Sequence, residues 1–157
     1  MESADAEPNN PEKMYKKRGV GLIIHNRSSD RFLFFLRDDI PTIPFPGMID
    51  IIGGHLDDGE EPEEALVREI AEELDDVDTG QPFVPNGYTQ FKQYIDELGT
   101  QQTIFGLELE EEPHLKLNEG QRLVWLGRAE IGNTDFAFGF KVVVQEYVAK
   151  VSKPHGT

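Results

Sequence analysis

The chain of 157 residues contains no cysteine, which excludes disulfide bonds, thiol catalysis and cysteine-based zinc sites. Basic residues are also scarce, because 15 lysines and arginines stand against 30 aspartates and glutamates, for a formal net charge of -15. Such a chain repels nucleic-acid phosphates and anionic membrane surfaces, so we expect neither as a partner. An anionic small-molecule substrate would need help from a metal ion.

Long apolar runs are missing as well. No segment approaches the roughly 20 apolar residues of a membrane span, and the first residues are polar and acidic. We therefore expect neither secretion nor membrane insertion, and a cytoplasmic location fits the lack of cysteine. The length suits one domain over residues 14–151, between a mobile polar tail at 1–13 and a C-terminal tail at 152–157. A homodimer is compatible with this organisation.

The most informative stretch runs from Gly54 to Asp75 and reads GHLDDGEEPEEALVREIAEELD. Pro62 occupies a position where the first turn of a helix tolerates proline, which predicts that a helix begins near Glu61. On 3.6-residue geometry, four apolar residues form one stripe along this helix. They are Leu66, Val67, Ile70 and Leu74.

Three acidic side chains form a patch beside this stripe. Glu69, Glu72 and Glu73 fall within an arc of roughly 100°. They lie towards the negative end of the helix dipole, and Glu69 and Glu73 form a repulsive i,i+4 pair. A bound divalent cation would reverse the sign of these interactions. Magnesium prefers carboxylate and carbonyl oxygens and is often completed by substrate phosphates, so the patch predicts a magnesium-diphosphate site.

This spacing resembles the box of the Nudix hydrolase family, G-x5-E-x7-R-E-U-x-E-E-x-G-U, in which U is a bulky apolar residue. Seven positions match it in register: Gly54, Glu60, Arg68, Glu69, Ile70, Glu72 and Glu73. The box ends differently, since Asp75 and Asp76 replace its last glycine and apolar residue. These departures concern the exit from the helix rather than the metal ligands.

The resemblance implies an α/β fold, namely the Nudix-type α/β/α sandwich with a mixed β-sheet. It also implies hydrolysis of a diphosphate linkage in a nucleoside diphosphate derivative (an NDP-sugar, ADP-ribose, an NTP or a related compound). The expected cofactor is Mg2+, with Mn2+ as an alternative ion. The expected metal ligands are the carbonyl group of Gly54 and the side chains of Glu69, Glu72, Glu73 and Glu119.

The resemblance also assigns roles in catalysis. Arg68 is expected to orient a box glutamate through a charge-assisted contact. Glu72 is the first candidate for the general base that takes the water proton, and Glu119 is the second. Glu119 lies in the segment Asn118-Glu119-Gly120 before a predicted strand, where a solvated turn glutamate is an equally good interpretation.

Two further residues are candidates for substrate binding. Arg37 ends a predicted strand beside the proline-rich loop 38–47, where it could bind a substrate phosphate or form a surface ion pair with Asp38 or Asp39. Phe45 in the same loop could stack on a nucleobase, although an aromatic residue in such a loop often serves packing alone.

Two other functions remain open at this stage. A non-hydrolytic Nudix-fold module could bind a nucleotide without cleaving it, but it would not need the full set of repelling glutamates. An isomerase of isoprenoid diphosphates could share the fold, but it ordinarily uses a cysteine for proton transfer, and this chain has none.

Apolar and β-branched or aromatic runs predict strands at 19–25, 32–37, 49–52, 88–95, 100–109 and 123–126. Residues 75–86 are predicted to form a loop. A second helix, capped by Thr134 or Asp135, is predicted from six apolar residues that recur at helical spacing. They are Phe136, Phe140, Val143, Val144, Tyr147 and Val151.

Overall fold

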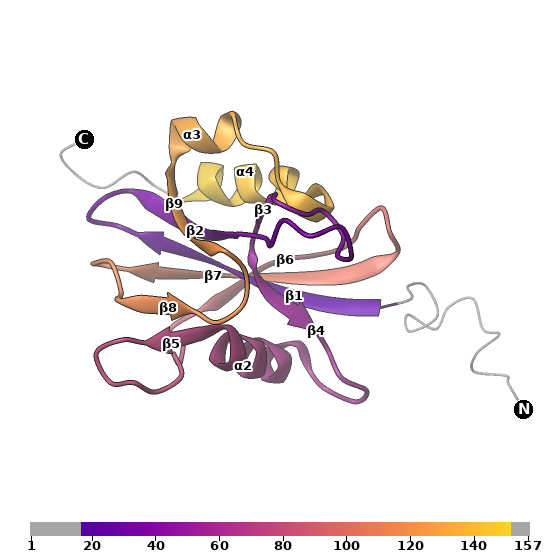
Figure 1. Cartoon of the computed structure of the whole chain (residues 1–157), viewed down its shortest axis with the longest axis horizontal. Helices are drawn as coiled ribbons and strands as arrows, with labels where there is room; N and C mark the ends of the chain where they lie inside the picture. The colour runs from indigo at the N-terminus through magenta and orange to yellow at the C-terminus, as the bar shows by residue number, and fades with distance from the viewer. Residues whose placement is uncertain (1–16, 152–157) are drawn as a thin grey trace, which may run out of the picture.

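A computed structural model describes residues 17–151 of the chain (Figure 1). The two predicted tails, 1–13 and 152–157, lie outside these described residues, as does the expected start of the domain at residue 14. Among the helices of the described part, none has the length and apolar composition needed to cross a membrane.

A mixed sheet of seven strands forms the centre of the fold. Its main order is β3-β2-β1-β7-β6, with β4 beside β1 and β9 beside β2. Strands β1 and β7 run in parallel, and the other pairs are antiparallel. The strands are β1 (Lys17–Asn26), β2 (Arg31–Leu36), β3 (Ile49–Asp50), β4 (Ile52–His55), β6 (Thr89–Ile95), β7 (Thr100–Leu109) and β9 (Arg122–Gly127).

Helices cover both faces of this sheet. Figure 1 shows α2 (Pro62–Glu73) on one side, with α3 (Arg128–Gly132) and α4 (Lys141–Lys150) on the other. Each face has its own apolar core, one packed against α2 and one against α4. The predicted α/β/α sandwich with a mixed sheet is therefore confirmed.

The predicted strand at 49–52 is divided in the structure. Ile49–Asp50 pairs with β2, whereas Ile52–His55 pairs with β1. The break falls at Ile51, whose backbone N–H donates to Asp50 Oδ1 at 2.8 Å. The side chain of Ile51 is buried in the core under α4. The change of partner strand brings the glycines of β4 beside β1.

Helix α2 begins where the sequence predicts. Glu61 is its N-cap residue, and the backbone N–H of Glu61 donates to Glu64 Oε1 at 2.9 Å. The apolar stripe is buried at Leu66, Ile70 and Leu74, but Val67 is exposed, and Ala65 fills the core in its place. The stripe is therefore shifted slightly from the predicted one.

The exit of α2 explains the departure from the family box. Leu74 has an extended backbone (φ -129°, ψ 132°), and the chain passes directly from the helix into β5 (Leu74–Asp76). Strand β5 pairs with β8 (Leu115–Leu117), so Asp75 lies in a strand opposite Lys116. Because the chain continues as a strand, it does not need the last glycine of the family box at the end of the helix. The predicted loop at 75–86 is therefore wrong at its beginning.

The predicted C-terminal helix is wrong at its start. Phe138 and Gly139 have φ angles of 57° and 70°, which interrupt an α-helix. The chain instead forms a short 3-10 turn, η2 (Ala137–Gly139), before α4 begins at Lys141. The six apolar residues that suggested this helix are nevertheless all buried in the core under α4. The short helix α3 was not predicted.

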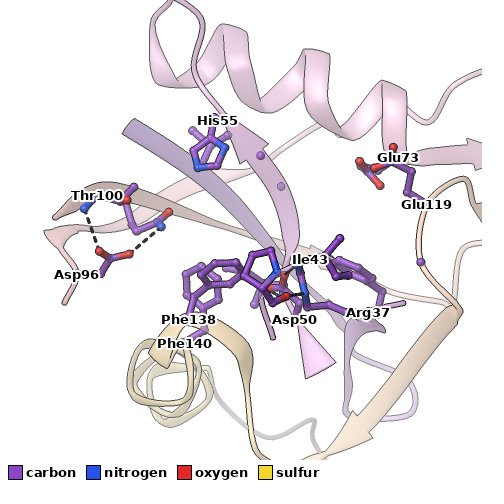
Figure 2. A pocket seen from close by; sticks show the side chains of 18 of the residues that line it. Arg37, Ile43, Asp50, His55, Glu73, Asp96, Thr100, Glu119, Phe138 and Phe140 are labelled. Carbon is purple, nitrogen blue, oxygen red and sulfur yellow. Dashed lines mark hydrogen bonds and ion pairs between the residues drawn. The ribbon is translucent and has the colours of Figure 1, made fainter. Parts of the chain in front are cut away.

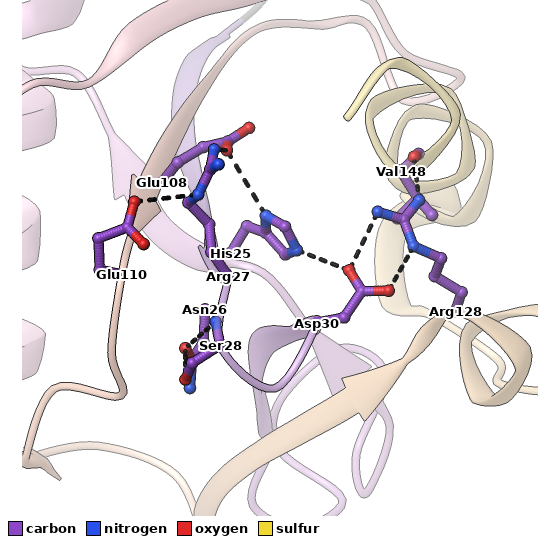
Figure 3. A network of polar contacts seen from close by, with 9 residues as sticks. All are labelled: His25, Asn26, Arg27, Ser28, Asp30, Glu108, Glu110, Arg128 and Val148. Carbon is purple, nitrogen blue, oxygen red and sulfur yellow. Dashed lines mark hydrogen bonds and ion pairs between the residues drawn. The ribbon is translucent and has the colours of Figure 1, made fainter. Parts of the chain in front are cut away.

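A polar network fastens the helical layer to the β1–β2 hairpin (Figure 3). Arg128 donates to both carboxylate oxygens of Asp30, at 2.8 and 3.0 Å, and to the carbonyl oxygen of Val148 at 2.7 Å. The hydrogen bonds from Arg128 keep the pKa of Asp30 below its usual range, despite some desolvation. The buried His25 ring contacts Asp30 Oδ1 at 2.8 Å. These contacts hold α4 in place over its core.

We predict that Gly53→Ala destabilises the protein by roughly 2 kcal/mol or more, because its Cβ would overlap the backbone carbonyl oxygen of Val20. Backbone atoms in a paired strand cannot move aside cheaply. Gly132→Ala is the matched control, since a Cβ there meets no atom within 4 Å. Urea unfolding of both variants measures the difference, and equal stability of the two would contradict the close packing of β4 on β1.

Candidate active site

Two of the predicted acidic residues, Glu73 and Glu119, meet where three segments of the chain converge. Strand β4 contributes Gly53 and Gly54, helix α2 contributes the glutamates, and the loop 118–120 contributes Glu119 (Figure 2). A Cβ on Gly54 would overlap the carboxylate of Glu69. The missing side chain of Gly54 therefore allows this carboxylate to lie directly against the backbone of β4.

Arg68 forms the densest set of polar contacts in this region. Its Nε and Nη2 atoms each donate to one carboxylate oxygen of Glu60 at 2.9 Å, and its Nη1 atom donates to Glu69 Oε2 at 2.8 Å. Nη2 also donates to the carbonyl oxygen of His55 at 2.9 Å. These hydrogen bonds hold the pKa of Glu60 at about 2 and raise the pKa of Arg68. The guanidinium group is thus committed to the protein and fixes the position of Glu69.

The second pair of acids is Glu73 and Glu119, whose side chains point towards one another in Figure 2. Burial and the facing carboxylate of Glu119 raise the pKa of Glu73 to about 8, with smaller contributions from Glu69 and Glu72. Both effects disfavour the charged form of Glu73, so its carboxyl group holds a proton more strongly than an ordinary glutamate does when no cation is bound.

Asn118 explains why Glu119 faces the helix. The backbone N–H of Asn118 donates to the carbonyl oxygen of Glu73 at 2.9 Å, and its side-chain amide donates to that of Glu72 at 3.0 Å. These are carbonyl groups at the end of α2, which have no partner within the helix. The same two hydrogen bonds cap the helix and bring Glu119 to its glutamates.

The carboxylate and carbonyl oxygens of this region are the ligands that a hard divalent cation prefers, but they do not surround a single point. In the described part of the chain, no three acidic or histidine side chains are grouped closely enough to hold a metal ion as they stand. Glu69 is turned towards Arg68, and Glu72 is exposed, with one oxygen 3.4 Å from Arg68 Nη1. The half-buried, mutually repelling carboxylates of Glu73 and Glu119 are the part that best fits a cation.

A cavity of about 750 Å³ extends from these acids across the sheet. This volume lies within the range of small-molecule sites. Gly54, Glu73 and Glu119 line one part, and an apolar wall is formed by Ile43, Pro44, Phe138 and Phe140. Polar side chains line a further part, namely Lys17, His55, Asp96, Thr100 and Gln102. The cavity can therefore hold both a diphosphate and an attached organic group.

Arg37 lines this cavity but does not pair with Asp38 or Asp39. Its Nη1 atom donates to Asp50 Oδ2 at 2.8 Å, and its Nε atom donates to the carbonyl oxygen of Pro44 at 2.9 Å. Burial raises the pKa of Asp50 to about 6, against the opposing effect of Arg37. The sequence did not predict this pair, because Arg37 follows β2 and Asp50 lies 13 residues further along the chain, in β3.

Phe45 does not line the cavity. Its ring lies 4.6 Å from the ring of Phe138, measured between centroids, and it is Phe138 that borders the cavity together with Phe140. Both Phe45 and Phe138 have left-handed backbones, with φ angles of 51° and 57°. Phe138 was not predicted from the sequence, although its position beside Gly139 in an otherwise apolar helical pattern is a sign of a break in the helix.

Comparison with known proteins agrees with this geometry. The model of the NUDIX domain matches residues 15–147, and the chain therefore belongs to the Nudix family. The expected class of enzyme, a Nudix pyrophosphohydrolase, is confirmed by this membership. No curated protein matches the chain significantly.

Several solved structures share the fold at low sequence identity. MutT, from work on Aliivibrio salmonicida and Vibrio cholerae, is 24% identical with a TM-score of 0.66, over 86% of this chain and 100% of the other. The NUDIX domain of Shewanella oneidensis NrtR, complexed with ADP ribose, is 16% identical with a TM-score of 0.67, over 96% and 97%. The MutT protein of Methanosarcina mazei is 21% identical with a TM-score of 0.61, over 85% and 93%.

We predict that the metal-free protein loses stability as the pH rises from about 4.5 to about 8. The pKa of Glu73 is about 8 in the folded protein, against 4.5 for a free glutamate, so the folded state binds more protons over this interval. The stability contributed by protonated Glu73 is therefore fully present below about pH 4.5 and is lost by about pH 8. Urea unfolding in the presence of a chelator, compared between the wild type and Glu73→Gln, measures this contribution.

The difference between the two proteins isolates Glu73 from other groups. Asp50, whose pKa is also raised, changes the stability of both proteins in the same way. The free energy of unfolding of Glu73→Gln should therefore increase relative to that of the wild type as the pH rises. A stability difference between the two proteins that is constant from pH 5 to pH 8 would show that the pKa of Glu73 is not raised.

Proposed function

We propose that the protein hydrolyses the diphosphate linkage of a nucleoside diphosphate derivative with the help of Mg2+, or alternatively Mn2+. The observation that carries this proposal is the Glu73–Glu119 pair at one part of the cavity, where burial and like charge raise the pKa of Glu73. A divalent cation offsets such repulsion. The complex of the NrtR domain with ADP ribose agrees with a ligand of this class.

We assign the metal to five groups around this pair. They are the carbonyl group of Gly54 and the carboxylates of Glu69, Glu72, Glu73 and Glu119. When bound, Mg2+ neutralises the diphosphate and lowers the pKa of a bound water. Arg68 keeps Glu69 in position through its 2.8 Å hydrogen bond, while its other donors hold Glu60 and the loop before the helix. Arg68 would thus act as a positioning residue.

Two carboxylates are candidates for the general base. Glu72 is the one that the sequence analysis favours, but it is exposed, and it does not line the cavity. Glu119 lines the cavity and approaches Glu73. Glu119 therefore faces the cavity whereas Glu72 does not, and a pH-rate profile can separate the two candidates.

Arg37 and the aromatic wall would bind the remainder of the substrate. Among residues 17–151, Arg37 uses Nη1 and Nε for Asp50 and Pro44, whereas its Nη2 atom has no protein acceptor and can bind a phosphate oxygen. The stacking role expected of Phe45 passes to Phe138, since Phe138 borders the cavity and Phe45 supports it from behind. Phe45 would then affect selectivity only through Phe138.

The alternative is a Nudix-fold module that binds a nucleotide without hydrolysing it. The fold alone permits this function. The intact set of Arg68, Glu69, Glu72 and Glu73 favours hydrolysis, because binding does not require several mutually repelling carboxylates. Incubation with nucleotides and Mg2+, followed by chromatography of the products, distinguishes the two functions.

We predict that Glu73→Gln folds but loses most of its Mg2+-dependent turnover, because one of the metal-binding charges is removed. Mg2+ should also raise the melting temperature of the wild type more than that of the variant. Glu63→Gln is the matched control, since Glu63 is exposed on the same helix and, within residues 17–151, its side chain accepts a hydrogen bond from Tyr88 alone, at 3.4 Å. An unchanged kcat/KM of Glu73→Gln at saturating Mg2+ would refute the assignment of Glu73 as a ligand.

We predict that replacing the general base changes the pH dependence of turnover more than the affinity for Mg2+. Glu72→Gln and Glu119→Gln should each be measured by Mg2+ titration and by a pH-rate profile. The variant that lacks the base should lose the acidic limb of the profile and keep nearly the same apparent metal affinity. If both variants retain this limb, neither glutamate is the base.

A further inference from the structure

A buried amide lines the cavity in the region of Asp96 and Thr100, which Figure 2 shows well away from Glu73 and Glu119. It belongs to Gln102 on β7, whose exposed fraction is only 7%. A buried polar side chain is costly unless its hydrogen-bonding groups find partners. The partners of Gln102 therefore indicate what this part of the cavity accepts.

Asp96 determines which way the amide points. The carboxylate of Asp96 accepts hydrogen bonds from the backbone N–H groups of Leu98 and Thr100, both at 2.9 Å, and from Gln102 Nε2 at 3.1 Å. A carboxylate engaged in this way only accepts. The amide nitrogen of Gln102 must therefore face Asp96, which leaves Oε1 on the opposite side as an acceptor.

Gly19 on β1 provides the space for this oxygen. Gly19 is the direct partner of Gln102 in the parallel β1–β7 pair, and a Cβ on Gly19 would stand 2.6 Å from Gln102 Oε1. The oxygen thus lies across the bare backbone of β1. Among residues 17–151, no donor forms a hydrogen bond to it. Oε1 is thus an acceptor of fixed orientation on a largely buried side chain at the cavity wall, and within residues 17–151 it is left to a ligand.

We propose that Gln102 Oε1 accepts a hydrogen bond from an N–H or O–H donor on the organic part of the substrate, away from the diphosphate. This inference rests on the proposed function and adds a selectivity to it. The donor can be an amino group of the base or a hydroxyl group of the sugar. A ligand that fills the cavity without such a donor leaves the buried oxygen unpaired, so the site discriminates against it.

The test compares nucleotides that differ by one donor. The pairs are AMP with purine riboside monophosphate, for the base amino group, and AMP with 2′-deoxy-AMP, for a sugar hydroxyl. Binding is measured by calorimetry, with Mg2+ present, for the wild type and for Gln102→Leu. Gln101→Leu is the matched control, since the neighbouring glutamine does not line the cavity.

The wild type and Gln101→Leu should bind the donor-bearing member of at least one pair roughly 5- to 150-fold more tightly. In Gln102→Leu this ratio should fall close to one, mainly through weaker binding of the donor-bearing member. Gly19→Ala, which displaces the amide without removing it, should reduce the same ratio. The pair that responds shows whether the donor is on the base or on the sugar.

The inference is overturned if no pair is discriminated, if none of these nucleotides binds, or if Gln102→Leu keeps the ratio of the wild type. A loss of the same size on every nucleotide also overturns it, because that indicates a general change of the cavity. Binding of monophosphates does not depend on hydrolysis. Discrimination without cleavage of any diphosphate would therefore support the role of Gln102 while refuting the proposed function.

Discussion

The hydrogen bonds of Arg68 are the interaction on which the acidic site depends. The guanidinium group of Arg68 joins α2 to the end of β4, through the carbonyl oxygen of His55, and to the following loop, through Glu60. It also binds the neighbouring carboxylate of Glu69. Without this cation, the glutamates of the helix would face one another with no compensating charge nearby. Arg68 is consequently the residue that allows a helix with several acidic side chains to pack at the end of a strand.

The two sides of the sheet contribute different parts of one cavity. The side of α2 provides Glu73 and its acidic neighbours, whereas the side of α4 provides the aromatic wall with Phe138 and Phe140. Glycines on β4 and β1 leave room for polar side chains along the cavity. Gly54 lets a carboxylate lie on β4, and Gly19 lets the Gln102 amide lie on β1. The cavity follows the strand surface where side chains are missing.

The sequence predicted the parts of this structure that depend on local spacing. The start of α2 and the placing of its acids follow from helical periodicity and from the box, and most strands follow from their apolar runs. The capping of α2 by Asn118 and the pairing of Arg37 with Asp50 arise from contacts between distant segments, which periodicity does not reveal. The left-handed backbone of Phe138 likewise depends on its tertiary surroundings, since an apolar helical pattern continued through it.

The direct passage from α2 into β5 makes the length of this junction decisive for the position of the acidic residues. No linker residue separates Glu73 from the strand that begins at Leu74. Side chains alternate between faces along a strand, so one inserted residue would turn Leu74 out of the core and shift the pairing of β5 with β8. The loop bearing Glu119 follows β8 directly and would move with it. Insertions are therefore tolerated in surface loops but not at the junction between α2 and β5.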